Sequence, residues 1–313
     1  MFLIVEKVMS IFVIVLIGFI LYRLGAVGDD SIKPITSILM NVSCPCLIIT
    51  SLYSKELTGN ILGDSLAVMA GVMLFYIFAS LLTFLFVKLT KIGQKEDTGV
   101  LMAAVAATNS GFMGFPIVKA LYGSDMLYLM VMGNLMLNVY MVWMEPSILT
   151  IGTKSRPSAK DMLNALKTPF VISLFVGFAM AFLHIKPSGI VDETMVMIGD
   201  ITIPLSMILV GIRLGSVKLR EIISMNNIII SIFAMVVVPL LVMLIMLPMG
   251  FINNDVKTII AVTAILPTAV IAVVIAEQYG ENSLLLSEIV SLTTIMSVVT
   301  IPFMAVVIDV LFR

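Results

Sequence analysis

Apolar residues gather in ten long stretches, and most polar residues fall in the short connections between them. Most stretches approach the roughly 20 residues that a helix needs to cross the hydrocarbon core of a bilayer. We therefore predict ten transmembrane helices, with approximate limits 8–24, 35–53, 64–87, 99–122, 126–150, 168–185, 192–213, 226–250, 256–279 and 284–311. The longest polar connection, residues 152–168, is expected to be a cytoplasmic linker between the fifth and sixth helices.

Composition supports a protein embedded in a lipid bilayer. The chain is 60% hydrophobic and 12% charged, whereas soluble domains average about 25% charged residues. A net charge of −1 gives no reason to expect a nucleic-acid partner. Cys44 and Cys46 flank a proline inside an apolar segment, and the lone His184 ends another, so we expect packing and interfacial roles and predict no metal site or cofactor.

The N-terminal segment is expected to be the first membrane helix and not a signal peptide. Glu6 precedes its apolar core, the core is longer than usual for a signal peptide, and no A-x-A cleavage site follows. If the N-terminus is outside, twelve of the 18 Lys and Arg residues fall on the cytoplasmic side. The positive-inside rule then predicts a multi-pass protein of the plasma membrane with both termini extracytoplasmic.

An internal repeat is visible at an offset of 159 residues. The aligned pairs are Gly18 with Gly177, Phe19 with Phe178, Asn41 with Asp200, Pro45 with Pro204, Thr108 with Pro267, and Asn109 with Thr268. Because each repeat contains five helices, an odd number, the second copy must be inverted relative to the first. Residues 1–151 and 169–313 are therefore expected to form two inverted repeats, an arrangement found in many secondary transporters and also compatible with channels.

Two apolar segments in corresponding positions of the repeats contain residues that break helices. The fourth carries TNSGFMGFP, Thr108 to Pro116, and the ninth carries AILPTAVIA around Pro267. A break frees N–H groups that suit an anion and carbonyl groups that suit a cation or a proton donor. We expect the two breaks to cross antiparallel near the bilayer midplane and to form the binding site, although each proline alone could simply kink its helix. The residues assigned to this site are Thr108, Asn109, Ser110, Gly111, Pro267 and Thr268.

Further polar residues are candidates to line a cavity beside the breaks. Asn134 and Asn138 lie one turn apart and share a face of the fifth helix. Thr293, Thr294 and Ser297 lie on the tenth helix. Small polar side chains also join membrane helices to one another, so the sequence leaves both roles open.

Ionisable residues within membrane segments are costly and therefore candidates for function. Asp200 is either a proton or sodium site or a structural hydrogen-bonding group, and its repeat partner Asn41 carries no charge. Asp64 begins the third segment, where an acid favours the helix dipole. Glu145 and Glu288 are expected to reach the cytoplasmic interface. No Lys or Arg occupies the centre of a segment, so a bound anion would need N–H groups and small polar side chains, and an accompanying H⁺ or Na⁺ stays open.

The segment NSGFMGFPIVKALYG, Asn109 to Gly123, resembles the fourth-helix motif of the auxin efflux carrier family, which contains plant PIN proteins and bacterial organic-acid permeases. The matching residues are Asn109, Met113, Gly114, Pro116, Lys119, Tyr122 and Gly123. Thr108 stands where PIN proteins have the crossover proline. LPTAVIAVVIAEQYG, Leu266 to Gly280, resembles the second crossover and keeps its proline, and NVSCPCLIITSL, from Asn41, resembles the second helix. The resemblance covers essentially the whole chain.

This resemblance implies a fold similar to that of sodium/proton antiporters and bile-acid transporters. Helices 1, 2, 6 and 7 would form a scaffold that assembles as a homodimer, and helices 3–5 and 8–10 would form a transport domain that moves in an elevator-type cycle. The implied substrate is a small carboxylate anion, such as auxin, malate or malonate. Coupling to H⁺ or Na⁺ stays open.

Other functional classes fit the sequence less well. A GxGD intramembrane protease needs a glycine where Met197 stands, and a single histidine excludes an H-E-x-x-H metalloprotease. A serine protease dyad would need a histidine deeper in the membrane than His184. A cation/proton antiporter of the same fold is the main alternative, but it normally has paired acids beside the crossover. A channel or a receptor fits broken, inverted helices less well than alternating access. We therefore predict a transporter and not an enzyme.

Overall fold

The structure is a computed structural model that describes residues 2–55, 58–151 and 168–313. Helices make up 83% of it, and no strand occurs in these ranges. The expected cytoplasmic linker, residues 152–168, lies outside the described residues except for Thr168. All of the ten apolar segments contain helix, so the apolar pattern of the sequence correctly predicted an all-helical chain.

The first half of the chain contains three very long helices and a set of shorter ones. Its elements are α1 (Phe2–Arg23), η1 (Asp29–Ser31), α2 (Ile32–Ile38), η2 (Leu39–Ser43), α3 (Cys44–Tyr53), α4 (Gly59–Thr90), α5 (Thr98–Ala106), η3 (Ser110–Gly114), α6 (Phe115–Trp143) and α7 (Glu145–Leu149). Elements η2 and η3 are π-helical turns. Gly123 divides α6 with a φ of 85°, which is where the sequence separates its fourth and fifth apolar segments. A glycine adopts this left-handed conformation without steric cost.

The second half has a similar succession of helices. Its elements are α9 (Pro169–Phe182), α10 (Ile190–Asp200), α11 (Thr202–Ser216), α12 (Leu219–Ile222), α13 (Met225–Ile232), η4 (Phe233–Val237), α14 (Val238–Met246), α15 (Asn254–Ile265), α16 (Val270–Gln278) and α17 (Ser283–Phe312). Element η4 is also a π-helical turn and leads directly into α14.

Six helical stretches of the described chain are long and apolar enough to cross a membrane. They are Asp29–Tyr53, Gly59–Thr90, Ser110–Trp143, Ile190–Ser216, Met225–Met246 and Ser283–Phe312. Many large apolar side chains on these helices are exposed, such as Leu74 and Val299, which are 65% and 74% exposed. An apolar surface of this kind suits contact with lipid.

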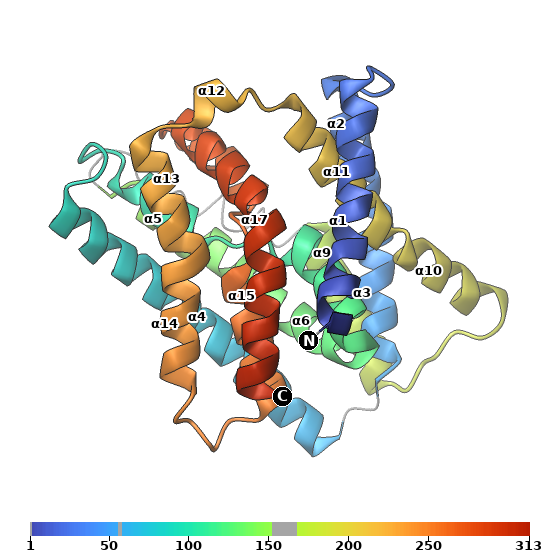
Figure 1. Cartoon of the computed structure of the whole chain (residues 1–313). Coiled ribbons are helices and arrows are strands. Elements are labelled where there is room, and N and C mark those ends of the chain that lie inside the picture. The colour runs from blue at the N-terminus through green and yellow to red at the C-terminus, as the bar shows by residue number, and fades with distance from the viewer. Residues whose placement is uncertain (1, 56–57, 152–167) are drawn as a thin grey trace.

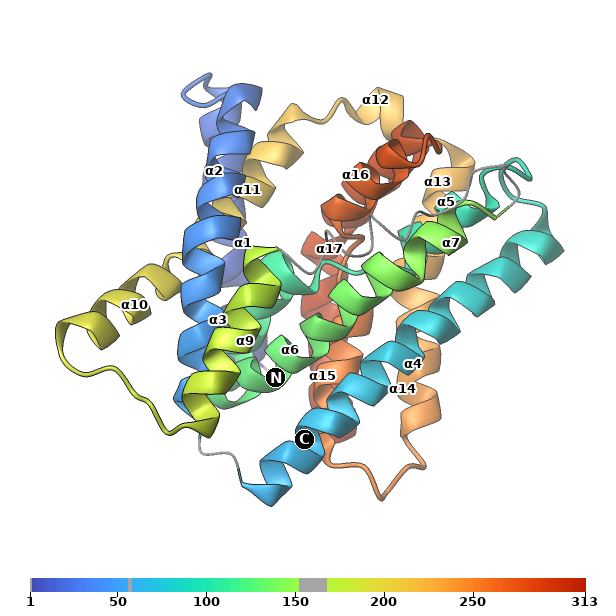
Figure 2. The same ribbon diagram turned by 180° about the vertical axis from the view of Figure 1, so that it is seen from behind.

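The helices pack in two sets. In one set, α1 packs along α11, and α3 packs against α9 and α10. In the other, α4 packs against α5, α6 and α15, and α17 packs against α13, α15 and α16. Figure 2 shows α6 running beside α4, with α7 continuing toward α5. Gly18 of α1 and Gly211 of α11 allow these two helices to approach each other closely. A Cβ at either position would overlap a backbone oxygen of the other helix.

Helix ends gather at two opposite faces of the molecule (Figure 1). One face carries α12 and the beginning of α2, and we call it the α12 face. The other carries the beginning of α4, the connection between α14 and α15, and the C-terminus, and we call it the C-terminal face. Both sets of helices reach both faces.

Candidate functional site

Two interrupted helices meet at the centre of the protein. Helix α5 ends at Ala106 and α15 ends at Ile265, and both chains then become extended. Thr108 and Thr268 form an antiparallel bridge between the two extended segments. The Asn109 N–H donates to the Pro267 carbonyl, and the Ala269 N–H donates to the Ala107 carbonyl, each over 2.7 Å. Each interruption frees backbone N–H and C=O groups inside the membrane protein. The two interrupted segments pair these groups with one another.

The local sequence explains why both helices stop here. Pro267 lacks an N–H and disfavours helical geometry at Leu266, which has a ψ of 147°. The first break has no proline at the crossing, but Asn109 Oδ1 accepts a hydrogen bond from the Phe112 N–H at 3.3 Å and caps the next helical turn. The break at Thr108 therefore forms without a proline at the crossing.

The register of the crossing differs from the sequence repeat by one residue. Thr108 faces Thr268, which corresponds to an offset of 160, whereas the sequence comparison aligned Thr108 with Pro267 at 159. The equivalent of Asn109 at the crossing is then Ala269, which caps α16 with no side-chain hydrogen bond. An alignment of weak single matches does not resolve a shift of one residue.

Two cavities lie on either side of the crossing. The larger, of about 450 Å³, is lined mainly by α11, α16 and α17. The smaller, of about 110 Å³, is lined by η3, α6 and the beginning of α16, with one residue each from η2, α3 and α9. Asn109 and Val270 line both cavities, so they lie between them. Val270 begins α16, where the first N–H groups have no partner within the helix. The junction of the two cavities therefore combines a polar amide with a helix N-terminus.

A short chain of polar side chains supports the first break. Asn134 Nδ2 donates to Ser110 Oγ at 2.5 Å, and Asn138 Nδ2 donates to the Asn134 carbonyl at 2.9 Å. Gly111, Asn134 and Asn138 all line the smaller cavity. Asn134 thus joins α6 to the break, Asn138 supports Asn134 from the next turn of α6, and both asparagines face a cavity.

The second break is supported by α17. Thr268 Oγ1 donates to the Ala104 carbonyl at 2.5 Å, and Thr293 Oγ1 donates to Thr268 Oγ1 at 3.3 Å. Thr293 Oγ1 also accepts from the Thr268 N–H. Thr294 lines the larger cavity, whereas Ser297 donates to the Thr294 carbonyl at 2.6 Å.

Asp200 and Asn41 lie away from the crossing. The Asp200 side chain is 53% exposed and forms an ion pair with Lys119 of α6 at 2.5 Å. Asn41 is exposed and donates to the Ser37 carbonyl and hydroxyl within its own helix. Of the two roles that the sequence left open for Asp200, the geometry favours the structural one.

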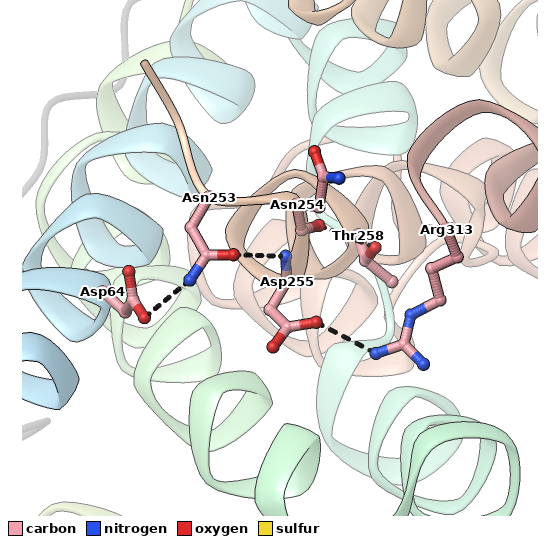
Figure 3. Close-up of polar contacts among 6 residues, drawn as sticks. All are labelled: Asp64, Asn253, Asn254, Asp255, Thr258 and Arg313. Carbon is pink, nitrogen blue, oxygen red and sulfur yellow. Dashed lines mark hydrogen bonds and ion pairs between the residues drawn. The ribbon is translucent and has the colours of Figure 1, made fainter. Parts of the chain in front are cut away.

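Asp64 takes part in a polar cluster at the C-terminal face (Figure 3). It is not at the helix start as expected, because α4 begins at Gly59, so Asp64 lies beyond the first turn where the helix dipole acts. Its Oδ2 accepts from Asn253 Nδ2 at 2.9 Å. Asp255 pairs with Arg313 at 3.0 Å in the same cluster. Asp64 therefore connects α4 to the beginning of α15 rather than lining the cavities described above.

Two charged residues lie in surroundings that the sequence did not predict. Arg213, in the last turn of α11, lines the larger cavity together with Lys218 and Glu288. Glu145 was expected to reach the interface, and that expectation is wrong, because the side chain is 0% exposed. Glu288 is half-buried and accepts from Asn227 Nδ2 at 2.8 Å. Position near a segment end was the available signal, and it does not distinguish a lipid interface from a protein cavity.

Comparison with known proteins connects this architecture to transport. The model of a family described as membrane transport protein matches residues 3–305. An uncharacterized transporter of Methanothermobacter thermautotrophicus is 25% identical over 302 residues, covering 96% of this chain and 97% of that protein. An uncharacterized transporter of Methanocaldococcus jannaschii is 22% identical over 308 residues, covering 95% and 96%. The chain therefore belongs to the membrane transport protein family, the auxin efflux carrier family that its fourth-helix motif indicated, and is a membrane transporter and not a member of an enzyme family.

Proposed function

We propose that the protein is a secondary transporter that binds a small organic carboxylate at the crossing of the two breaks. The observation that carries this proposal is the position of Asn109 and of the N-terminus of α16 between the two cavities. An amide N–H₂ and the first N–H groups of a helix are donors suited to a carboxylate. Thr108, Ser110, Gly111, Pro267, Thr268, Asn134 and Asn138 would complete or support this site.

The charge of the larger cavity favours an anion. Among its described lining residues, Arg213 and Lys218 are basic and Glu288 is the single acid. Basic groups at the mouth of a low-dielectric cavity raise the local concentration of anions. With Lys/Arg-rich connections on the α12 face, we assign this face to the cytoplasm and both termini to the outside of the plasma membrane. The larger cavity would then be the route between the site and the cytoplasm.

We propose ten transmembrane helices in two inverted repeats, residues 1–151 and 169–313. The packing of α1 with α11, and of α3 with α9 and α10, supports a scaffold built from helices 1, 2, 6 and 7. The packing of α4 with α5, α6 and α15 supports a separate transport domain. In the elevator-type cycle that the family resemblance implies, the second set would slide along the first, and the scaffold would form the homodimer interface.

Two ion pairs at the side opposite the larger cavity fit this cycle. Lys55, after α3, pairs with Asp125 of α6, and Asp200 of α10 pairs with Lys119 of α6. Both pairs join the proposed scaffold to the proposed transport domain. All four residues line a third cavity, of about 510 Å³, which is separate from the two cavities at the crossing. In an outward-open state these pairs would separate. Asp200 would then stabilise one conformation of the transporter and would not bind the coupling ion.

Uptake of labelled malonate, malate and indole-3-acetate into proteoliposomes tests the proposal. We expect saturable uptake of at least one of these, and a loss of about 10- to 100-fold in Asn109→Ala, because hydrogen bonds to a charged group contribute about 1.5–3 kcal/mol. Asn60→Ala removes an exposed amide on α4 and is expected to behave as wild type. Full uptake by folded Asn109→Ala protein would place the site elsewhere. Dissipation of a sodium or pH gradient without carboxylate movement would instead establish the cation/proton antiporter.

A further inference from the structure

Glu145 is a buried acid that has no hydrogen-bond partner in the described part of the chain. Its side chain is 0% exposed at the beginning of α7. Neither carboxyl oxygen has a hydrogen-bond partner among the residues that the structure describes. Buried polar groups in native proteins are nearly always hydrogen-bonded, so an unpaired buried carboxyl requires an explanation.

The described residues around Glu145 supply no compensating positive charge. Helices α5, α6 and α16 pack against α7. The sequence of α5, TGVLMAAVA, has no ionisable residue, and Glu277, the one acid of α16, is exposed. The charge of Glu145 acts on two titratable neighbours, the phenols of Tyr140 on α6 and Tyr76 on α4. No described Lys, Arg or His acts on it. An isolated carboxylate in such a place is very costly, so this conformation holds Glu145 as the neutral acid.

Two tyrosines lie between Glu145 and the crossing. The rings of Tyr76 and Tyr140 are 5.0 Å apart, and Tyr140 Oη is 3.0 Å from Ser80 Oγ. The Tyr76 hydroxyl is directed toward Thr108 and Ser110 at the first break. Neither Tyr76 Oη nor Thr108 Oγ1 has a hydrogen-bond partner within the described ranges. The Tyr76 side chain therefore lies within electrostatic reach of the buried acid and next to the first break, and its hydroxyl is free to change partner.

We propose that Glu145 is a proton-binding site of the transport cycle and that Tyr76 links its protonation to the crossing. This inference rests on the proposed function and specifies the coupling ion as H⁺. On deprotonation the carboxyl O–H bond breaks and the proton passes to water at the α12 face. The Tyr76 hydroxyl then turns to donate to the carboxylate and moves away from Thr108 and Ser110. Ser110 is held by Asn134 beside Asn109, so the change alters the anion site. By linkage, bound anion and bound proton affect each other equally.

Proteoliposomes loaded with a pH-sensitive dye test the coupling, with labelled malonate and indole-3-acetate as the probes. We expect wild-type uptake to carry protons inward and to increase when the outside is acidified. Glu145→Gln, which imitates the neutral acid, should still allow downhill uptake but without proton movement or response to the pH gradient. Glu277→Gln is the matched control and should behave as wild type. Tyr76→Phe should also lose the response to the pH gradient, and it provides a test if Glu145→Gln fails to fold.

A second measurement does not depend on the substrate. A neutral acid in the folded state that ionises on unfolding makes stability fall as pH rises. We expect the melting temperature in detergent to fall between about pH 5 and about pH 9 by several degrees more in wild type than in Glu145→Gln. If no probe is transported, the proposed function fails, while this measurement still decides whether Glu145 binds a proton. Equal falls in both proteins, or wild-type uptake driven by sodium and indifferent to pH, would overturn the inference.

Discussion

The break after α5 and the break after α15 have paired backbones but different side-chain chemistry. At the first, Asn109 caps the following turn and lies between the two cavities, and the Thr108 hydroxyl has no partner in the described structure. At the second, Pro267 ends the helix and Thr268 is hydrogen-bonded through both its N–H and its hydroxyl. Ala269 offers no polar side chain where Asn109 stands in the first break.

This difference indicates a division of roles at the crossing. The second break is a rigid support whose polar groups are used within the protein. The first break keeps polar groups available for a ligand or for rearrangement. A crossing formed from two repeats can therefore have similar backbones and still offer an asymmetric site, which suits an asymmetric substrate.

The paired variants Thr268→Val and Thr108→Val should show the largest difference between the breaks. Thr268→Val leaves the buried Ala104 carbonyl without its donor, and we expect it to lower the free energy of unfolding by about 1–3 kcal/mol. Thr108→Val removes a hydroxyl with no described partner and should change stability by less than about 0.5 kcal/mol. Unfolding in detergent micelles measures both. Equal losses would mean that the breaks are supported in the same way.

The Asn134 contact should have an intermediate effect. Asn134→Ala leaves the buried Ser110 hydroxyl without its donor, and we expect a loss of about 1 kcal/mol. Ser110→Ala in the same background should add little, because the two side chains share one hydrogen bond. The same unfolding measurement on the two single variants and the double variant gives the coupling. Additive losses would show that the first break does not depend on this bond.

Pro267→Ala should have the smallest effect. The Pro267 carbonyl that accepts from the Asn109 N–H is retained in alanine, so the backbone pairing can persist. The loss is chiefly the restriction that proline places on Leu266 and on the unfolded chain, about 1 kcal/mol or less. Pro116→Ala, at the start of α6, is the matched control in the first break. A loss at Pro267 as large as that expected at Thr268 would show that the proline itself holds the crossing together.

The positions of the two breaks could be predicted from the sequence because their causes are local. A proline in the ninth apolar segment removes a backbone donor wherever it lies. The asparagine, serine and glycines after Thr108 favour a cap and a turn over a continuous helix. The family could be identified for the same reason, because its motif contains the residues that interrupt the helix and start the next one.

The roles of the charged residues could not be predicted in this way. Asp200 and Asp64 were candidates because they lie in or next to apolar segments, yet one pairs with Lys119 and the other with Asn253, 81 and 189 residues away. Arg213 and Glu145 both lie near segment ends. The first lines a cavity and the second is fully buried. Distance along the segment gives depth in the membrane and says nothing about which helix lies alongside.

The sequence by itself determined that this protein is helical, apolar and interrupted at Thr108 and Pro267, because hydropathy and helix breaking depend on residues close together in the chain. Only the tertiary structure decided that Thr108 faces Thr268 and that Asn109 lies between two cavities. It also decided that Glu145 has no counter-charge among its described neighbours. Those outcomes depend on the angles and registers at which distant helices pack, and small residues such as Gly18 and Gly211 permit that packing without specifying its partners.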